Sequence, residues 1–300
     1  MKFKKKMRIA LVSMKTLYHD PRAKGLKLKA DIEANLERHR YWLAKALEQE
    51  PDFVGFPEFA LTGWVFHPSY CLSLNSPVVR EIESMARRHH IYLATGLVER
   101  RGGRLQNTCL IAGPRGRVGV MHKINLIGLG NRYYTPGREF PVFDVAGCRM
   151  GVATCADASP YAMIHILSLR GAEVIFAPHA NSLGAYGNNR NGWLRWRRGN
   201  WPTVARDSRV YIAGMSGAGL FDRPRAGEEE YKYCGGGAVV DWEGKFQAKL
   251  GGQTKREGLL VADLDLAGLR AERAKGFSHS FRPDIVYNRP RSWWESYPVS

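Results

Sequence analysis

Short apolar runs alternate with amphipathic stretches along this chain of 300 residues, and the alternation is what most constrains its fold. Residues 9–14 are short and apolar, like a buried strand, whereas residues 30–49 place Ile32, Leu36 and Leu43 at helical spacing. The same patterns predict strands at 92–97, 108–112, 118–121, 150–153 and 174–177, and helices at 78–86, 161–169 and 193–207. This order predicts an α/β fold in which sheets are covered by helices.

Three of the apolar runs end in a reactive side chain. One run reaches Pro57 and then Glu58, a second ends at Lys123, and a third leads into a turn at Cys155. A cysteine at a strand end is held rigidly beside exposed backbone, as a nucleophile needs to meet a substrate and an oxyanion donor together. Singly, each residue also fits an ordinary alternative: a solvated carboxylate, a surface amine or a small buried thiol. Together, the acid, amine and thiol favour a catalytic site.

The sequence blocks around these residues resemble the nitrilase, or carbon–nitrogen hydrolase, superfamily, whose members share Glu, Lys and Cys in this chain order. The matching blocks are Phe56, Pro57, Glu58, Gly63 and Trp64; residues 96–99, Asn107, Lys123 and Leu126; Tyr133, Tyr134, Pro136 and Gly137; Cys155 and Asp157; and the stretches 171–180, 205–214 and 234–246. The resemblance therefore covers nearly the whole chain. It implies a single domain over residues 1–300, built as a four-layer α-β-β-α sandwich. Residues 265–300 would form a C-terminal extension for contacts within a homodimer or larger homo-oligomer.

The resemblance also implies a role for each reactive group. Cys155 would attack the substrate and carry the thioester acyl-enzyme, with Glu58 as general base and then general acid. The base is needed because a thiol with a pKa of about 8.5 is mostly protonated at neutral pH. Lys123 and the backbone N–H of Ala156 would stabilise the oxyanion of the tetrahedral intermediate. This chemistry needs no metal and no cofactor.

Four further residues are candidates for contacts with the substrate. Trp64 and Tyr134 are placed to line the pocket, although aromatic residues at such positions are more often part of a core. His179 and Asn181 follow the strand predicted at 174–177, at the end where the family often places substrate contacts. A histidine satisfied by backbone groups in a loop is an equal alternative. Residues 184–192 are predicted to form either a mobile loop over the site or an exposed connection without function.

Two departures from the family pattern bear on the expected substrate. Many members carry a second glutamate six residues before the Pro of the aromatic, Pro, Gly segment, and counting back from Pro136 gives Gly130. Either this polar contact is missing, or Glu139 or another acid replaces it in space. Nitrilases usually follow the cysteine with Trp and Glu, whereas Ala156 and Asp157 stand here. We therefore expect a linear amide as substrate, followed by N-carbamoyl amino acids or amines, with nitriles third.

Basic residues exceed acidic ones by 17, because 45 lysines and arginines face 28 aspartates and glutamates. Residues 193–201 also interleave tryptophans with arginines, which is typical of nucleic-acid contact. We favour a solvated helix whose tryptophans pack inward or against a partner subunit. Arginines that face the pocket and select an acidic substrate are a third hypothesis. The non-enzyme alternative is a basic nucleic-acid- or anion-binding protein on a decayed hydrolase scaffold.

Five cysteines without CxxC spacing argue against a disulfide framework and against a zinc site. The apolar stretch at residues 9–12 is too short for the core of a secretory signal. The sequence also predicts no transmembrane segment and no contact with membranes. We expect a cytoplasmic protein, because a reducing compartment suits a catalytic thiol.

Overall fold

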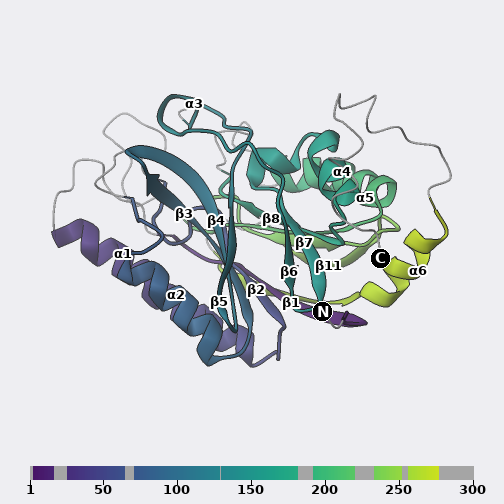
Figure 1. Cartoon of the computed structure of the whole chain (residues 1–300), viewed down its shortest axis with the longest axis horizontal. Coiled ribbons are helices and arrows are strands. Elements are labelled where there is room, and N and C mark those ends of the chain that lie inside the picture. Colours follow the sequence, from purple (N-terminus) through teal and green to yellow (C-terminus); the bar gives the residue numbers. More distant parts are fainter. Residues whose placement is uncertain are drawn as a thin grey trace.

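The computed structural model describes residues 3–16, 26–64, 71–128, 130–181, 192–219, 233–251 and 256–276. Two six-stranded sheets pack face to face, and helices lie on their outer faces (Figure 1). In spatial order, the first sheet contains β12 (Gly258–Asp265), β1 (Lys6–Ser13), β2 (Phe53–Gly55), β3 (Tyr92–Arg101), β4 (Arg104–Gly113) and β5 (Gly116–His122). The second contains β11 (Phe246–Leu250), β10 (Gly237–Val240), β9 (Tyr211–Ser216), β8 (Val174–His179), β7 (Cys148–Val152) and β6 (Val142–Val145). The predicted four-layer α-β-β-α sandwich is confirmed.

Helices cover the two outer faces. α1 (Leu26–Leu47) and α2 (Pro77–Arg88) lie on the first sheet, and α4 (Tyr161–Leu169) and α5 (Gly192–Ser208) lie on the second (Figure 1). The residues whose spacing predicted a helix, Ile32, Leu36 and Leu43, are all buried in the apolar core beneath α1 and α2. Burial of this face, at roughly 25 cal/mol per Å² of apolar surface, holds the helices on the sheet.

Each sheet has three parallel strands at its centre. β1, β2 and β3 run parallel in the first sheet, and β7, β8 and β9 do so in the second. Antiparallel strands extend both sets, with β12, β4 and β5 on the first and β6, β10 and β11 on the second. Loops that follow parallel strands emerge at one edge of a sheet, and ligands commonly bind there.

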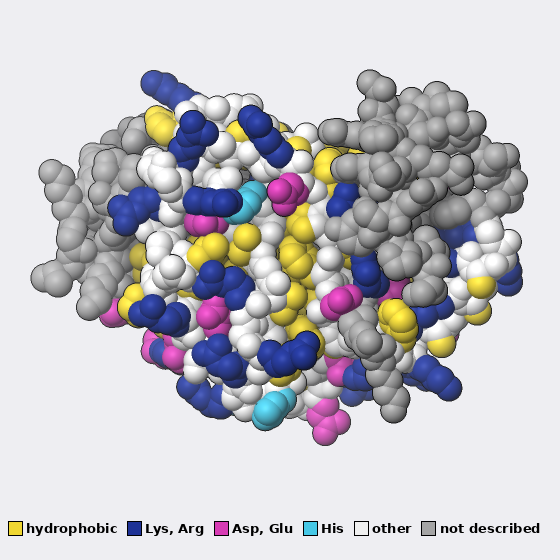
Figure 2. All heavy atoms as spheres, viewed as in Figure 1, with side chains coloured by type: hydrophobic (Ala, Val, Ile, Leu, Met, Phe, Trp, Pro, Cys, Tyr) yellow, Lys and Arg dark blue, Asp and Glu magenta, His cyan; other side chains and the backbone are white. Residues whose placement is uncertain are grey.

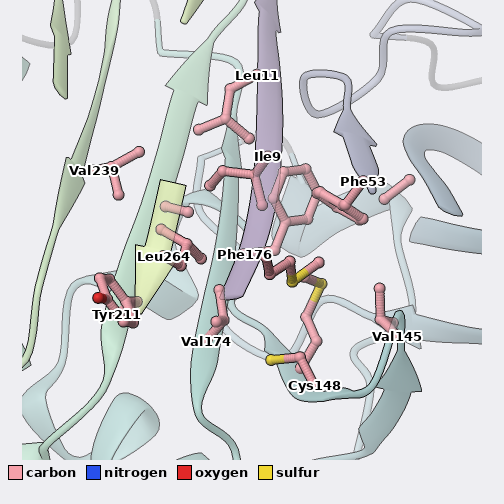
Figure 3. Packing of buried hydrophobic residues seen from close by; sticks show 14 of the residues in the cluster. Ile9, Leu11, Phe53, Val145, Cys148, Val174, Phe176, Tyr211, Val239 and Leu264 are labelled. Carbon is pink, nitrogen blue, oxygen red and sulfur yellow. The ribbon is translucent and has the colours of Figure 1, made fainter. Parts of the chain in front are cut away.

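An apolar core between the sheets sets the distance between them. Phe53 of β2 and Phe176 of β8 meet edge to face, with ring centroids 5.2 Å apart (Figure 3). Gly55 lies against the same Phe176 ring, and a Cβ at this position would collide with it. Gly119 of β5 lies against Phe143 of β6 in the same way. The close approach of the two sheets therefore depends on glycine at both positions.

The C-terminal part of the described chain belongs to this core. α6 (Leu266–Ala274) follows β12 and buries Leu266 and Leu269 between the sheets. The predicted extension at residues 265–300 thus begins with an element of the main fold, while residues 277–300 lie outside the described ranges. Within the described ranges, none of the helices combines the length and the apolar character that a membrane crossing requires.

Candidate active site

Loops from both sheets meet around one cavity of about 90 Å³. Glu58 lies three residues after β2 and Lys123 directly follows β5, so both come from the first sheet. Cys155 lies three residues after β7, in the second sheet. The lining also includes Trp64, Gly130, Tyr134 and Asn181. The structure therefore brings the three predicted reactive groups to the same small space.

The Glu58 carboxylate is held by three hydrogen bonds. Its Oε1 accepts from Lys123 Nζ at 2.6 Å and from Asn107 Nδ2 at 2.7 Å, and its Oε2 accepts from the backbone N–H of Ala180 at 2.8 Å. Only 2% of the glutamate is exposed. Ala180 follows β8, so this contact joins the two sheets directly. The family resemblance includes Asn107 in one of its blocks, but the sequence did not predict that Asn107 contacts Glu58.

Lys123 is buried and stays charged. Burial alone would lower the pKa of its ammonium, but the nearby Cys155 and Glu58 outweigh that effect and raise the pKa. The backbone fixes its place after β5, because its N–H donates to Asn107 O at 2.9 Å and its O accepts from Gly137 N at 2.8 Å. Lys123 thus presents a fixed positive charge to the cavity.

Cys155 occupies a strained backbone conformation. It is the first residue of the 3-10 helix Cys155–Ala158 and has φ = +51°, which is rare for a residue with a side chain. Its Sγ donates to Asn181 Oδ1 at 3.3 Å. Burial and the Glu58 charge raise the pKa of the thiol to about 11, although Lys123 and Arg197 act in the opposite direction. The thiol is therefore neutral at pH 7 and needs a base to become a nucleophile.

The rest of the 3-10 helix connects the thiol to the lysine. Asp157 is completely buried, and its carboxylate accepts from Asn125 N at 2.7 Å and from Ile124 N at 3.2 Å. Burial raises the pKa of Asp157 to about 6, against the lowering effect of these backbone bonds and of Lys123. Ala156 is the second residue of the helix, where N–H groups have no partner within the helix itself. Asp157 thus ties the Cys155 turn to the loop that carries Lys123.

A comparison with known families identifies the family of this chain. A family model described as carbon–nitrogen hydrolase matches residues 8–274. The chain belongs to the carbon–nitrogen hydrolase family. It is similar to the omega-amidase NIT2 of Mus musculus, at 28% identity over 248 residues, which cover 78% of this chain and 84% of that protein.

Solved structures of carbon–nitrogen hydrolases show the same fold. An amidase from Nesterenkonia sp. matches with a TM-score of 0.68 at 23% identity, covering 90% of this chain and 94% of that one. A carbon–nitrogen hydrolase from Helicobacter pylori G27 matches with a TM-score of 0.74 at 18% identity, covering 95% and 98%. Mutants of the Nesterenkonia amidase were solved with butyramide, and with the acetamide moiety of fluoroacetamide attached to the active-site cysteine. Identities this low support a shared fold only.

Arg197 supports the turn that carries Cys155, a contact that the sequence pattern did not predict. Its guanidinium is 2% exposed and donates to Cys155 O at 3.1 Å and to Ala158 O at 2.9 Å. It also lies 5.3 Å from the ring centroid of Trp201, which is fully buried. The interpretation of 193–201 as a solvated helix with inward tryptophans holds for Trp201 but is wrong for Arg197. The signal was available, because residues four apart share one face of a helix.

Three of the four predicted substrate contacts line the cavity of this carbon–nitrogen hydrolase. Trp64 and Tyr134 do so, and both pack against Phe59, with ring centroids 6.1 and 6.0 Å from the Phe59 ring. Asn181 lies beside Cys155. The predicted loop at 184–192 lies outside the described residues except for Gly192, which begins α5.

His179 lies away from the lining. It is completely buried, and its ring stacks on Trp201 with centroids 5.7 Å apart. Successive side chains of a strand point to opposite faces, so His179 shares the helix-facing side of β8 with Ile175 and Ala177. Burial, together with the charges of Arg197 and Lys123, lowers the pKa of His179. The neutral imidazole therefore packs beneath α5, and the predicted contact between His179 and substrate does not fit this position.

The family's second glutamate has no counterpart on the described lining. Gly130, at the start of α3 (Gly130–Tyr133), borders the cavity, and Glu58 is the one carboxylate among the described residues around it. Glu139, which was considered as a replacement, lines a separate hollow. Among the described residues there is also no group of three or more His, Cys, Asp or Glu side chains that could hold a metal ion.

Proposed function

We propose that this carbon–nitrogen hydrolase cleaves a linear amide through a thioester on Cys155. The observation that carries the proposal is the placement of Glu58, Lys123 and Cys155 around one cavity, with the acid and the amine 2.6 Å apart. A thiol with a pKa near 11 needs a proton acceptor within reach, and Glu58 is the carboxylate on the lining.

The reaction begins with transfer of the thiol proton to Glu58 as Sγ attacks the amide carbon. The carbonyl oxygen becomes an oxyanion, which the Lys123 ammonium and the Ala156 N–H stabilise. Protonated Glu58 then gives its proton to the departing nitrogen, the carbon–nitrogen bond breaks, and ammonia or an amine leaves a thioester on Cys155. Glu58 next takes a proton from water, whose oxygen attacks the thioester. Collapse releases a carboxylic acid and returns the proton to the thiol.

Linear amides rank first because of both the relatives and the cavity. The named relatives act as omega-amidase and amidase, and one amidase mutant was solved with butyramide. The aromatic rings of Phe59, Trp64 and Tyr134 offer apolar contact to a short acyl chain. The same nucleophile and base would also cleave the ureido group of N-carbamoyl compounds. Assembly as a homodimer or larger homo-oligomer and a cytoplasmic location belong to the same proposal.

The test is ammonia or amine release from a panel of linear amides, N-carbamoyl amino acids and nitriles. We expect the parent to hydrolyse at least one linear amide and Cys155→Ala to lose all turnover. Cys109→Ala is the matched control, because Cys109 is a buried thiol in the core between the sheets. Release that survives in Cys155→Ala would refute the mechanism. A parent inactive on the whole panel that is retained on nucleic acid would favour the binding-protein alternative.

A further inference from the structure

A hollow separate from the active site lies at the same end of the first sheet, on the opposite face of strands β4 and β5. Its volume is about 460 Å³, and its lining includes Arg101, Arg104, Arg138 and His122. The three arginines are exposed. Figure 2 shows dark-blue Lys and Arg side chains to the left of and above a cyan histidine in the upper part of the molecule, with a magenta acidic side chain to its right, in the area of β4 in Figure 1.

This hollow is separate from the catalytic cavity because strand residues alternate between faces. Gln106 lines the hollow, whereas its neighbour Asn107 lines the active site. Likewise, His122 and Thr135 line the hollow, whereas their neighbours Lys123 and Tyr134 line the active site. One layer of backbone therefore separates the two spaces. The mechanism uses none of the side chains that face the hollow.

The hollow gathers three arginines of like charge. Arg101 and Arg104 lie directly opposite each other across β3 and β4, an arrangement in which like charges repel. Within the described part of the chain, neither they nor Arg138 form an ion pair. The lining also carries Glu139, which likewise forms no ion pair with a described residue. The hollow therefore keeps an excess of positive charge.

The nearest buried acid is already engaged elsewhere. Glu99 is 3% exposed, and its Oε2 accepts from Thr108 Oγ1 at 2.9 Å and contacts His122 Nε2 at 2.9 Å. This pairing holds the imidazole at the wall. Burial acts to raise the pKa of Glu99, but the hydrogen bonds from His122 and Thr108 and, more weakly, the charge of Arg101 lower it, so Glu99 partly offsets the charge of Arg101. Gln106 also lines the hollow, although its Oε1 is buried. The hollow thus offers mainly cationic donors to a ligand.

We propose that this hollow binds a phosphate group, either as free phosphate or on a small phosphate ester. Guanidinium groups suit the oxygens of phosphate because they donate paired hydrogen bonds to them. The site relies on exposed guanidinium groups, which a ligand in the hollow can reach. It is independent of the amidase proposal, because its ligand does not enter the catalytic cavity.

The test is a titration of the full chain with inorganic phosphate at low salt, followed by ³¹P NMR and by thermal stabilisation. We expect saturable binding that weakens about tenfold in Arg104→Gln/Arg138→Gln, because two charge-assisted contacts are lost. Arg115→Gln is the control, since Arg115 is exposed beyond the opposite end of β4. It removes one charge elsewhere and should change binding by less than about twofold, as an exposed charge contributes little.

Two results would overturn the proposal: a response that does not saturate, or equal weakening by Arg115→Gln. Glycerol phosphate separates the two sources of the ligand. Tighter binding of the ester identifies a phosphate ester as the ligand, and equal or weaker binding identifies free phosphate.

Discussion

The first sheet contributes charge to the candidate active site, whereas the second contributes a neutral thiol and backbone groups. On the first sheet, Glu58 and Lys123 form an ion pair that Asn107 supports. On the second, Cys155 adopts φ = +51° above the buried Arg197. An ion pair holds the carboxylate of Glu58, whereas the thiol of Cys155 is positioned by an unusual backbone conformation. In the proposed mechanism, the base and the nucleophile therefore come from different sheets, and the packing of the two sheets sets their relative position.

Glu58→Gln tests the charged half and should have the largest effect. We expect turnover to fall by about 10²–10⁴-fold, because the general base is lost. At the same time the pKa of Cys155 should fall, since the Glu58 charge helps to raise it. Half-maximal alkylation of Cys155 by iodoacetamide would then occur at a lower pH than in the parent. The alkylation rate of Cys155→Ala protein is subtracted, so that only the reaction of Cys155 is followed.

Glu83→Gln is the matched control for Glu58→Gln, because Glu83 is a buried carboxylate that pairs with Arg117 far from the thiol. It should leave both turnover and the alkylation profile unchanged. Turnover of Glu58→Gln within a few fold of the parent would remove Glu58 from the role of base.

Asp157→Asn tests the link between the two halves through stability. The pKa of Asp157 rises from 3.8 to about 6 on folding, so between these pH values the unfolded chain has released a proton that the folded chain keeps. The free energy of unfolding of the parent therefore falls as pH rises through this window, by about 3 kcal/mol at about 1.4 kcal/mol per unit. The variant lacks this contribution, because an amide replaces the carboxyl group. Urea unfolding gives the difference in free energy of unfolding between Asp157→Asn and the parent. From pH 4 to pH 7 this difference should change by up to about 3 kcal/mol in favour of the variant. A difference that stays constant would contradict the raised pKa of Asp157.

Arg197→Met tests the buried cation beside the thiol and should have the smallest effect, about tenfold on kcat with little change in KM. The cation lowers the pKa of Cys155, so its removal should move the alkylation profile to higher pH. Arg197→Lys should restore the profile more than kcat, since an ammonium keeps the charge but cannot bond to both carbonyls in the same way. Arg206→Met, an exposed change on α5, is the control. An unshifted profile in Arg197→Met would show that the residue supports structure alone.

The fold was predictable to the extent that single elements have strong periodicity. Ile32, Leu36 and Leu43 marked α1, and uniformly buried strands such as β8 read as apolar runs. Three strands at sheet edges, β6, β11 and β12, were not predicted from their own patterns. β11 alternates half-buried and exposed positions, so its short sequence carries little apolar signal. The face-to-face packing of two sheets came from the family resemblance, because alternation of elements alone does not determine it.

The candidate site was predictable where a reactive residue ends a strand and was missed where the contact is tertiary. Glu58, Lys123 and Cys155 belong to the first kind. Arg197 reaches Cys155 O across 42 residues of chain, and a buried arginine looks like a surface arginine in sequence. His179 shows the opposite error, because its position near a strand end suggested a substrate contact while the alternation of β8 placed it beneath α5.

Gly55 touches no substrate, yet it governs how the two halves of the site meet. A methyl group at this position would act as a wedge against Phe176 and push the β2 strand outward, carrying the acid three residues further on away from the sulfur. The residue contributes by leaving its volume empty. A mutational screen that measures turnover alone would therefore group Gly55 with the reactive residues, although Gly55 acts only through the packing of the two sheets.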